Sequence, residues 1–105
     1  MSDVMYEKII SENAEKGSQL RLVVNTFRDV EYLHLRKYFL SYEGEWVPTK
    51  EGASMPYTIQ SAFSLLDGLI EILANEESID SVNTHFQERL QALNEQNSRI
   101  PKHGE

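Results

Sequence analysis

Two neighbouring stretches near the middle of the chain alternate apolar and polar residues with a period of two. In residues 19–27 one side holds Leu20, Leu22, Val24 and Thr26, and the other holds Arg21, Val23, Asn25 and Phe27. Such alternation with β-branched residues is typical of a half-buried strand. Residues 30–42 repeat the pattern, with Leu33 and Leu35 opposite Tyr32, His34, Arg36 and Tyr38. Because only Arg28 and Asp29 separate the two stretches, we predict an antiparallel hairpin.

The flanking segments predict further, less regular strands. A turn that contains Gly44 leads into a third strand, which Pro48 interrupts because proline lacks the backbone donor of a strand ladder. Gly52 is expected to mark a bulge or a bend before a short fourth strand. The N-terminal residues 4–12 have strand-like content but weak alternation, so that a strand, a short helix and a frayed tail all stay open for them.

The period changes to that of a helix after Thr58, whose hydroxyl is suited to cap a helix start. Apolar residues recur three or four positions apart over residues 58–77. Leu65 and Ile72 widen this apolar stripe beyond one face. We therefore expect the helix to contact the sheet and something else, for which a partner subunit is the simplest candidate. A second helix with a narrow apolar seam is predicted over residues 78–96.

The composition suits one small globular domain. The chain has 105 residues, of which 40% are hydrophobic and 26% are charged. It contains no cysteine, which excludes disulfides and thiol catalysis. No signal peptide opens the sequence, and no apolar run approaches the roughly 20 residues of a membrane span. We therefore expect an intracellular protein.

The net charge of −7 is unevenly distributed. Residues 1–15 carry −3 and residues 57–105 carry −5, whereas residues 16–56 hold six bases and five acids. Seven of the ten aromatic residues lie between Phe27 and Tyr57, in or directly beside this middle part. Since the local field rather than the total charge decides what a surface attracts, the middle of the chain is the candidate binding region.

No pattern in the sequence indicates catalysis. The three histidines, His34, His85 and His103, have no acidic residue or cysteine at the spacing of metal ligands. There is no phosphate-binding loop, no dinucleotide-binding glycine pattern and no spacing that pairs a nucleophile with a base. We predict that the protein is not an enzyme and that it uses no metal or other cofactor.

Cations and aromatic rings are interleaved along the predicted strands. Single-stranded nucleic acid is held by cations along its backbone and by rings on which its bases stack, each ring contributing about 1–3 kcal/mol. The candidates are Arg28, Arg36 and Lys50 for phosphates, and Phe27, Phe39 and Trp46 for bases. The spacing alone also allows a purely structural interpretation, in which the rings belong to the core and the cations serve solubility.

Residues 27–54, FRDVEYLHLRKYFLSYEGEWVPTKEGAS, resemble the single-stranded-DNA-binding core of the transcriptional coactivator called positive cofactor 4 and of its prokaryotic and viral relatives. The shared pattern comprises, in order, Phe27-Arg28 at a hairpin, Leu35-Arg36-x-Tyr38-Phe39 at a strand end, Gly44 in a turn, and then Pro48, Lys50, Gly52 and Ser54 before a helix. The resemblance covers about half of the chain, residues 20–73.

This resemblance implies an α+β fold, with a curved four-stranded antiparallel sheet followed by a helix. Two copies would pair through their helices and bind single-stranded or melted DNA without strong sequence preference. By position, the resemblance makes Phe27 and Phe39 stacking platforms, and it makes Arg28, Arg36 and Lys50 backbone contacts. Trp46 and Arg21 complete the candidate nucleic-acid-binding set.

The resemblance also suggests how the chain is divided. Residues 19–77 would be the DNA-binding core, preceded by an N-terminal extension or strand over 1–18. Residues 78–96 would form an extra C-terminal helix, and residues 97–105 a flexible tail.

The chain departs from the family pattern at several positions. Phe39 stands where the family often has tryptophan, and Glu51 replaces a second basic residue. Val30 and Val47 stand where lysine is frequent, so we expect either a lower affinity or one that depends more on stacking and less on salt. The Ser-rich and Lys-rich leader of eukaryotic coactivators is absent. We therefore expect a bacterial or viral protein that is cytoplasmic or nucleoid-associated, in the host cell if it is viral, and not secreted.

The sequence leaves several functions open. A homodimer on single-stranded DNA could serve replication, recombination and repair, or transcription. Single-stranded RNA is bound by the same devices and is not separated from DNA by the sequence. The alternative of another class is an acidic homodimeric adaptor that contacts proteins and makes no direct contact with DNA.

Overall fold

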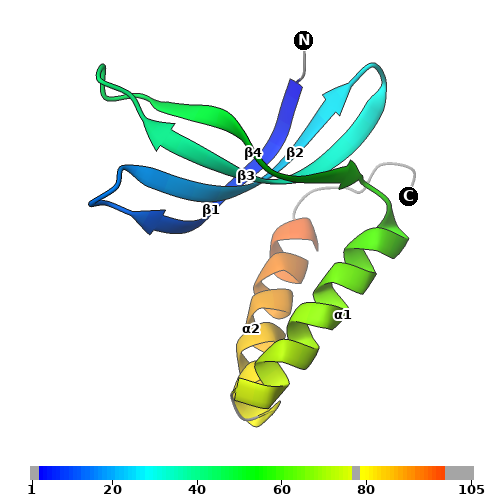
Figure 1. Ribbon diagram of the computed structural model, residues 1–105. Helices are drawn as coiled ribbons and strands as arrows, with labels where there is room; N and C mark the ends of the chain where they lie inside the picture. Colours follow the sequence, from blue (N-terminus) through cyan, green and yellow to red (C-terminus); the bar gives the residue numbers. More distant parts are fainter. Residues whose placement is uncertain (1–2, 77–78, 99–105) are drawn as a thin grey trace. The chain divides into compact units, whose positions relative to one another are not determined.

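The computed structural model of the protein describes residues 3–76 and 79–98, which form a sheet unit up to residue 59 and a helical unit after it. The sheet unit contains β1 (Asp3–Asn13), β2 (Ser18–Phe27), β3 (Val30–Leu40) and β4 (Trp46–Pro56). Each strand pairs antiparallel with the next strand in the chain. The sheet is strongly twisted (Figure 1), which is the usual behaviour of long strands. The predicted four-stranded antiparallel sheet is confirmed.

The strands are divided differently from the sequence prediction. The N-terminal segment, for which strand and helix had both stayed open, is the edge strand β1, and residues 46–56 form one strand instead of two. The strand β4 stays continuous because it absorbs its irregularity as a bulge. Arg36 pairs with Gly52 and Tyr38 pairs with Pro48, so three residues of β4 face one residue of β3. Inside this bulge the hydroxyl of Thr49 donates a hydrogen bond of 2.8 Å to the carbonyl of Lys37.

Two places in the sheet need unusual backbone conformations. Arg28 and Asp29 have φ values of 53° and 66°, which is the geometry of a two-residue hairpin turn whose twist matches the flanking strands. Gly52 has a φ of 142°, and a Cβ placed there would lie 2.2 Å from the carbonyl oxygen of Leu35. Any side chain at position 52 would therefore collide with the backbone of β3.

The registers divide the side chains of the sheet between two faces, because residues directly opposite each other in an antiparallel pair share a face. We call one of them the polar face; it carries Glu7, Glu12, Gln19, Arg21, Asn25, Phe27, Tyr32, His34, Arg36, Tyr38 and Ser54. We call the other the apolar face; it carries Leu20, Leu22, Val24, Leu33, Leu35 and Met55. The alternation predicted for residues 19–42 is confirmed.

The helical unit contains nearly all of α1 (Ile59–Glu76) and the whole of α2 (Ile79–Ser98). The first helix begins directly after Thr58, as predicted, and the second agrees with its predicted range to within two residues. Ile70 of α1 lines one hollow together with Val82 and Phe86 of α2. Among the described helices, none is both long and apolar enough to cross a membrane. Of the predicted tail, residues 99–105 lie outside the described part of the chain, and His103 is among them.

Candidate nucleic-acid interface

The first feature of the polar face is Arg21, whose guanidinium contacts three other side chains of the protein. The carboxylate of Glu7 on β1 binds Arg21 Nη1, and the side-chain oxygen of Gln19 accepts a hydrogen bond of 2.8 Å from Arg21 Nε. The guanidinium carbon lies 4.2 Å from the centroid of the Tyr38 ring, in cation–π contact. Gln19, which is 4% exposed, also donates to the carboxylate of Glu12. Arg21 is therefore fixed and partly neutralised, with 15% of its side chain exposed.

The second feature is a buried histidine at the middle of β3. His34 is 8% exposed and lies between Val23 of β2 and Ser54 of β4 in the sheet register. Its Nδ1 is 2.5 Å from Ser54 Oγ, and its Nε2 is 2.8 Å from Asn25 Oδ1. Burial lowers the pKa of His34, and the positive charge of Arg36 lowers it further. The imidazole is therefore favoured in its neutral form.

Arg36 follows His34 on the same face and differs from Arg21 in its partners. Its Nη2 lies 3.3 Å from His34 Nδ1. Within the described part of the chain, no carboxylate forms an ion pair with Arg36, whereas the neighbouring Lys37 reaches Glu51 at 3.4 Å. The half-buried guanidinium of Arg36 therefore keeps its charge available for an anion.

The hairpin tip between β2 and β3 presents an aromatic–cation pair. Phe27 ends β2 and is 39% exposed, and the guanidinium carbon of Arg28 lies 5.0 Å from the centroid of its ring. The left-handed turn at Arg28 and Asp29 holds the exposed Arg28 beside the ring. A cation next to an exposed ring is an arrangement that suits the phosphate and the base of one nucleotide.

The remaining predicted residues lie in different places. Trp46 pairs with Leu40, so it shares the polar face with Arg36, and it is half-buried. Phe39, which is 45% exposed, pairs with Ser18 and Val47 and therefore lies on the apolar face. Lys50 is exposed in the bulge of β4, where it has no partner in the register. The polar face thus brings together Arg21, Phe27, Arg36 and Trp46, whereas Phe39 points to the other side of the sheet.

The structure also adds residues to this surface that were not among the predicted set. Tyr38 lies under Arg21, and burial, followed by the charge of Glu7, raises the pKa of its hydroxyl. Tyr32 stacks on His34 with ring centroids 6.2 Å apart. Their even spacing with Arg36 along residues 30–42 was a usable signal for both tyrosines. The contribution of Glu7 was not predictable, because it depends on how β1 registers against β2.

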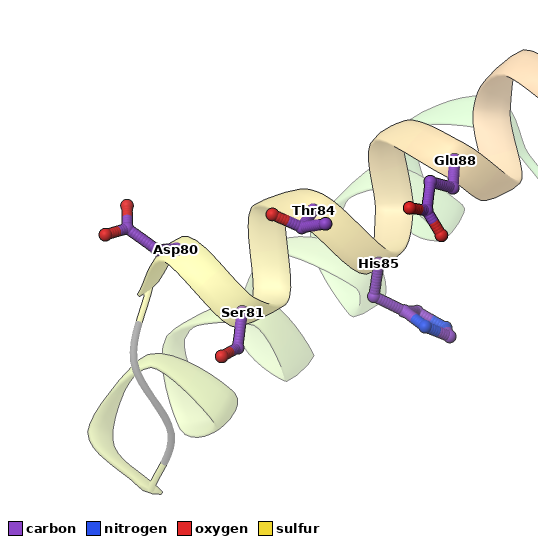
Figure 2. A pocket seen from close by; sticks show the side chains of 5 residues that line it. All are labelled: Asp80, Ser81, Thr84, His85 and Glu88. Atoms are coloured by element: carbon purple, nitrogen blue, oxygen red, sulfur yellow. The ribbon is translucent and has the colours of Figure 1, made fainter.

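A second hollow lies on the surface of α2 (Figure 2). Its lining residues are Asp80, Ser81, Thr84, His85 and Glu88. All five come from one helix, and their side chains project away from it rather than into an enclosed space. Among the described residues, no group of three or more acidic, histidine or cysteine side chains is placed to hold a metal ion. This hollow therefore offers no binding chemistry comparable to that of the polar face.

Comparison with known proteins agrees with the geometry of the sheet. The family model described as Transcriptional Coactivator p15 (PC4) matches residues 14–62, which run from the β1–β2 turn into α1. No curated protein sequence matches this chain. The chain is similar to a solved structure described as the bacteriophage T5 homologue of the eukaryotic transcription coactivator PC4, implicated in recombination-dependent DNA replication. The two chains are 34% identical, with a TM-score of 0.67, and the match covers 82% of this chain and 94% of the other. The resemblance predicted from the sequence is therefore confirmed, and this chain belongs to the PC4 family of coactivator-like DNA-binding proteins.

Proposed function

We propose that this protein binds single-stranded DNA on its polar face, without strong sequence preference. It would act on melted DNA in replication, recombination and repair, or transcription. The observation that carries this proposal is the guanidinium of Arg36, which stands on a face with Phe27 and Trp46 and makes no ion pair with the carboxylates that the structure describes. Family membership supports DNA as the ligand, and the T5 relative is implicated in recombination-dependent DNA replication.

The chemistry of the face supports contacts to backbone and rings rather than to base edges. Arg36 and Arg28 can each donate several hydrogen bonds to phosphate oxygens. The exposed ring of Phe27 and the half-buried ring of Trp46 can stack on bases of any sequence. The buried polar groups, His34 and Gln19, already have partners inside the sheet, which leaves them little capacity to read bases.

We also propose that two copies pair through α1. Eight large apolar side chains of this helix are more than one third exposed, from Ile59 to Leu73, and no residue of α1 is buried. So much exposed apolar surface on one helix is uncommon unless a partner covers it. Light scattering should give twice the 12.1 kDa mass of the chain. A Phe63→Glu variant, altered at a side chain that is 68% exposed, should shift the mass toward one copy; a monomeric parent would contradict this part of the proposal.

Two adjacent cations on opposite faces provide the test of DNA binding. The fluorescence of Trp46 is followed during titration with oligo-dT for the parent, Arg36→Ala and Lys37→Ala, at several salt concentrations. If the strand lies on the polar face, Arg36→Ala should weaken binding and lower the slope of log affinity against log salt by about 0.7, the value for one phosphate contact on a single strand. Lys37→Ala removes the same charge from the apolar face, so it should leave most of the affinity intact.

The alternatives predict different results in the same experiments. Equal losses in the two variants would place the contacts elsewhere than on the polar face. Competition with duplex DNA and with a ribo-oligomer of the same length measures the preference for single strands and for DNA. An absence of binding to any of these nucleic acids at low salt would favour the protein-interaction adaptor.

A further inference from the structure

The buried imidazole at the centre of the polar face has a role that DNA contact does not explain. His34 is 8% exposed, so a strand of DNA cannot reach most of its ring. Both of its nitrogens lie close to other side chains, namely Ser54 and Arg36 at Nδ1 and Asn25 at Nε2. Of these three partners, Arg36 alone carries a charge, and it is also the cation on which the proposed function depends.

The partners fix the protonation of the ring. A guanidinium group has donors and no acceptor, so the contact of 3.3 Å between Arg36 Nη2 and His34 Nδ1 requires an unprotonated Nδ1. The proton of the neutral ring must then sit on Nε2, which donates to Asn25 Oδ1 at 2.8 Å. With Nδ1 unprotonated, the Ser54 hydroxyl at 2.5 Å also donates to this nitrogen, so Ser54 and Arg36 share its one lone pair. A second proton on the ring would place an N–H and a positive charge against the guanidinium, and the lowered pKa of His34 agrees with this.

We propose that neutral His34 is a positioning residue, which holds the guanidinium of Arg36 on the polar face through Nδ1. The inference rests on the proposed function, since it assigns His34 a part in binding single-stranded DNA. An arginine side chain loses much conformational freedom when it is fixed, and a fixed donor group therefore binds an anion at a lower entropic cost. Arg21 is fixed by a carboxylate, which offsets its charge. Arg36 is fixed by an uncharged acceptor, which leaves its charge intact.

Two conservative variants separate the two nitrogens of the ring. His34→Asn keeps a polar group at the position of Nδ1 and loses the one at Nε2, whereas His34→Gln keeps the position of Nε2 and loses that of Nδ1. Each variant is combined with Arg36→Ala, and the four proteins are compared with the parent and with Arg36→Ala alone. Affinity for oligo-dT is measured for all six, and circular dichroism and thermal unfolding confirm that each is folded.

We expect His34→Asn to bind within about twofold of the parent and His34→Gln to bind about five- to tenfold more weakly, the loss that corresponds to one hydrogen bond of ordinary strength. In the Arg36→Ala background, His34→Gln should cause no further loss, because the effect acts through the arginine. Equal losses from the two His34 variants, or the same loss in both backgrounds, would overturn the positioning role and leave the proposed function intact. A parent that fails to bind oligo-dT would overturn the proposed function, and this role would fall with it.

A measurement on the parent protein covers the case in which His34→Gln does not fold. Nitrogen-15 NMR of the histidine rings at neutral pH should show His34 as the neutral tautomer protonated on Nε2. Addition of oligo-dT should then shift the signals of His34 Nδ1 and of the Arg36 guanidinium together. The inference would be overturned if the ring is protonated on Nδ1. It would also be overturned if oligo-dT shifts the Arg36 signal and leaves the His34 signal unchanged.

Discussion

The contact between Glu7 and Arg21 gives a direct test of how the acidic β1 strand affects binding. The Glu7 carboxylate forms an ion pair with Arg21. Without this ion pair, Arg21 would be a second available cation on the polar face, beside Arg36. Glu7→Gln removes the negative charge but keeps an oxygen that can accept from Arg21. The geometry should survive, since Gln19 and Tyr38 still hold the guanidinium and a partly exposed ion pair contributes only about 0.2–1 kcal/mol to stability.

The expected effect lies in the dependence of binding on salt. With its charge uncompensated, Arg21 gains one phosphate contact, which raises the slope of log affinity against log salt by about 0.7 for a single strand. Between about 50 and 200 mM salt, a change of that size amounts to about a threefold difference, so Glu7→Gln should bind more tightly than the parent at low salt and converge with it at high salt. Affinity for oligo-dT is measured by fluorescence anisotropy at four or more salt concentrations.

The matched control is Glu15→Gln, which makes the same change in net charge at an exposed position in the turn between β1 and β2. It should alter the affinity slightly and leave the slope unchanged. If Glu7→Gln has the slope of the parent, Arg21 stays committed to Gln19 and Tyr38 and makes no phosphate contact. If Glu15→Gln raises the slope equally, the effect is one of total charge, and the specific competition by Glu7 is wrong.

Three further predictions follow from single residues. Phe39→Ala should leave the Kd for oligo-dT within about twofold of the parent, because its ring, 45% exposed, lies on the apolar face away from the proposed strand; a rise of about fivefold or more, the loss of a stacked base at about 1–3 kcal/mol, would show that the strand also reaches the apolar face. Burial and then Arg36 lower the pKa of His34, so the folded protein binds the His34 proton less readily than the unfolded chain does. The free energy of unfolding is therefore at its full value with respect to His34 above about pH 6.5, and it decreases as the pH falls toward the folded-state pKa. Urea unfolding at about pH 7.5 and 5.5 should show that loss, and His34→Gln should reduce it. Gly52→Ala, with its Cβ 2.2 Å from a backbone oxygen of β3, should lower the melting temperature more than Gly44→Ala, whose Cβ meets nothing within 4 Å and whose cost of about 1–2 kcal/mol is that of its positive φ alone; equal shifts would contradict the close approach.

The sequence predicted those parts of the site that depend on periodicity within one strand. Alternation along residues 30–42 assigned His34, Arg36 and Tyr38 to one face, and the registers of the sheet agree. The same rule assigns Phe39 to the opposite face, because an odd number of positions separates it from Arg36. The family resemblance assigned Arg36 to the DNA backbone and Phe39 to base stacking, and neither role specifies the face on which the residue lies.

Contacts between strands could not be predicted from the sequence, for a physical reason. The pairing of Glu7 with Arg21 depends on a register that shifts between Val4 and Tyr6 and again between Ile9 and Ser11. Each shift moves the following side chains relative to their partners, and nothing local in residues 3–13 encodes its position. The neutral acceptor beside Arg36 was likewise invisible, because the burial of His34 requires neighbours from β2 and β4.

These contacts also resolve the apparent conflict between an acidic chain and a DNA ligand. The net charge of −7 opposes the long-range approach of any nucleic acid. At close range, however, the acidic residues of the polar face do not act as a uniform repulsive layer, because the carboxylates of Glu7 and Glu12 are bound to Arg21 and Gln19. Beside these two carboxylates, a strand would meet Arg36, which contacts the neutral imidazole of His34. It would also meet aromatic rings, which stack on bases by an interaction that does not depend on charge. Such a surface favours a ligand that presents unpaired bases as well as phosphates, because stacking does not weaken with salt whereas a phosphate contact does. Duplex DNA offers the phosphates but keeps its bases stacked on each other. Under the proposed function, the negative charge of the chain should therefore cost duplex DNA more of its affinity than single-stranded DNA, so that acidity would favour single strands.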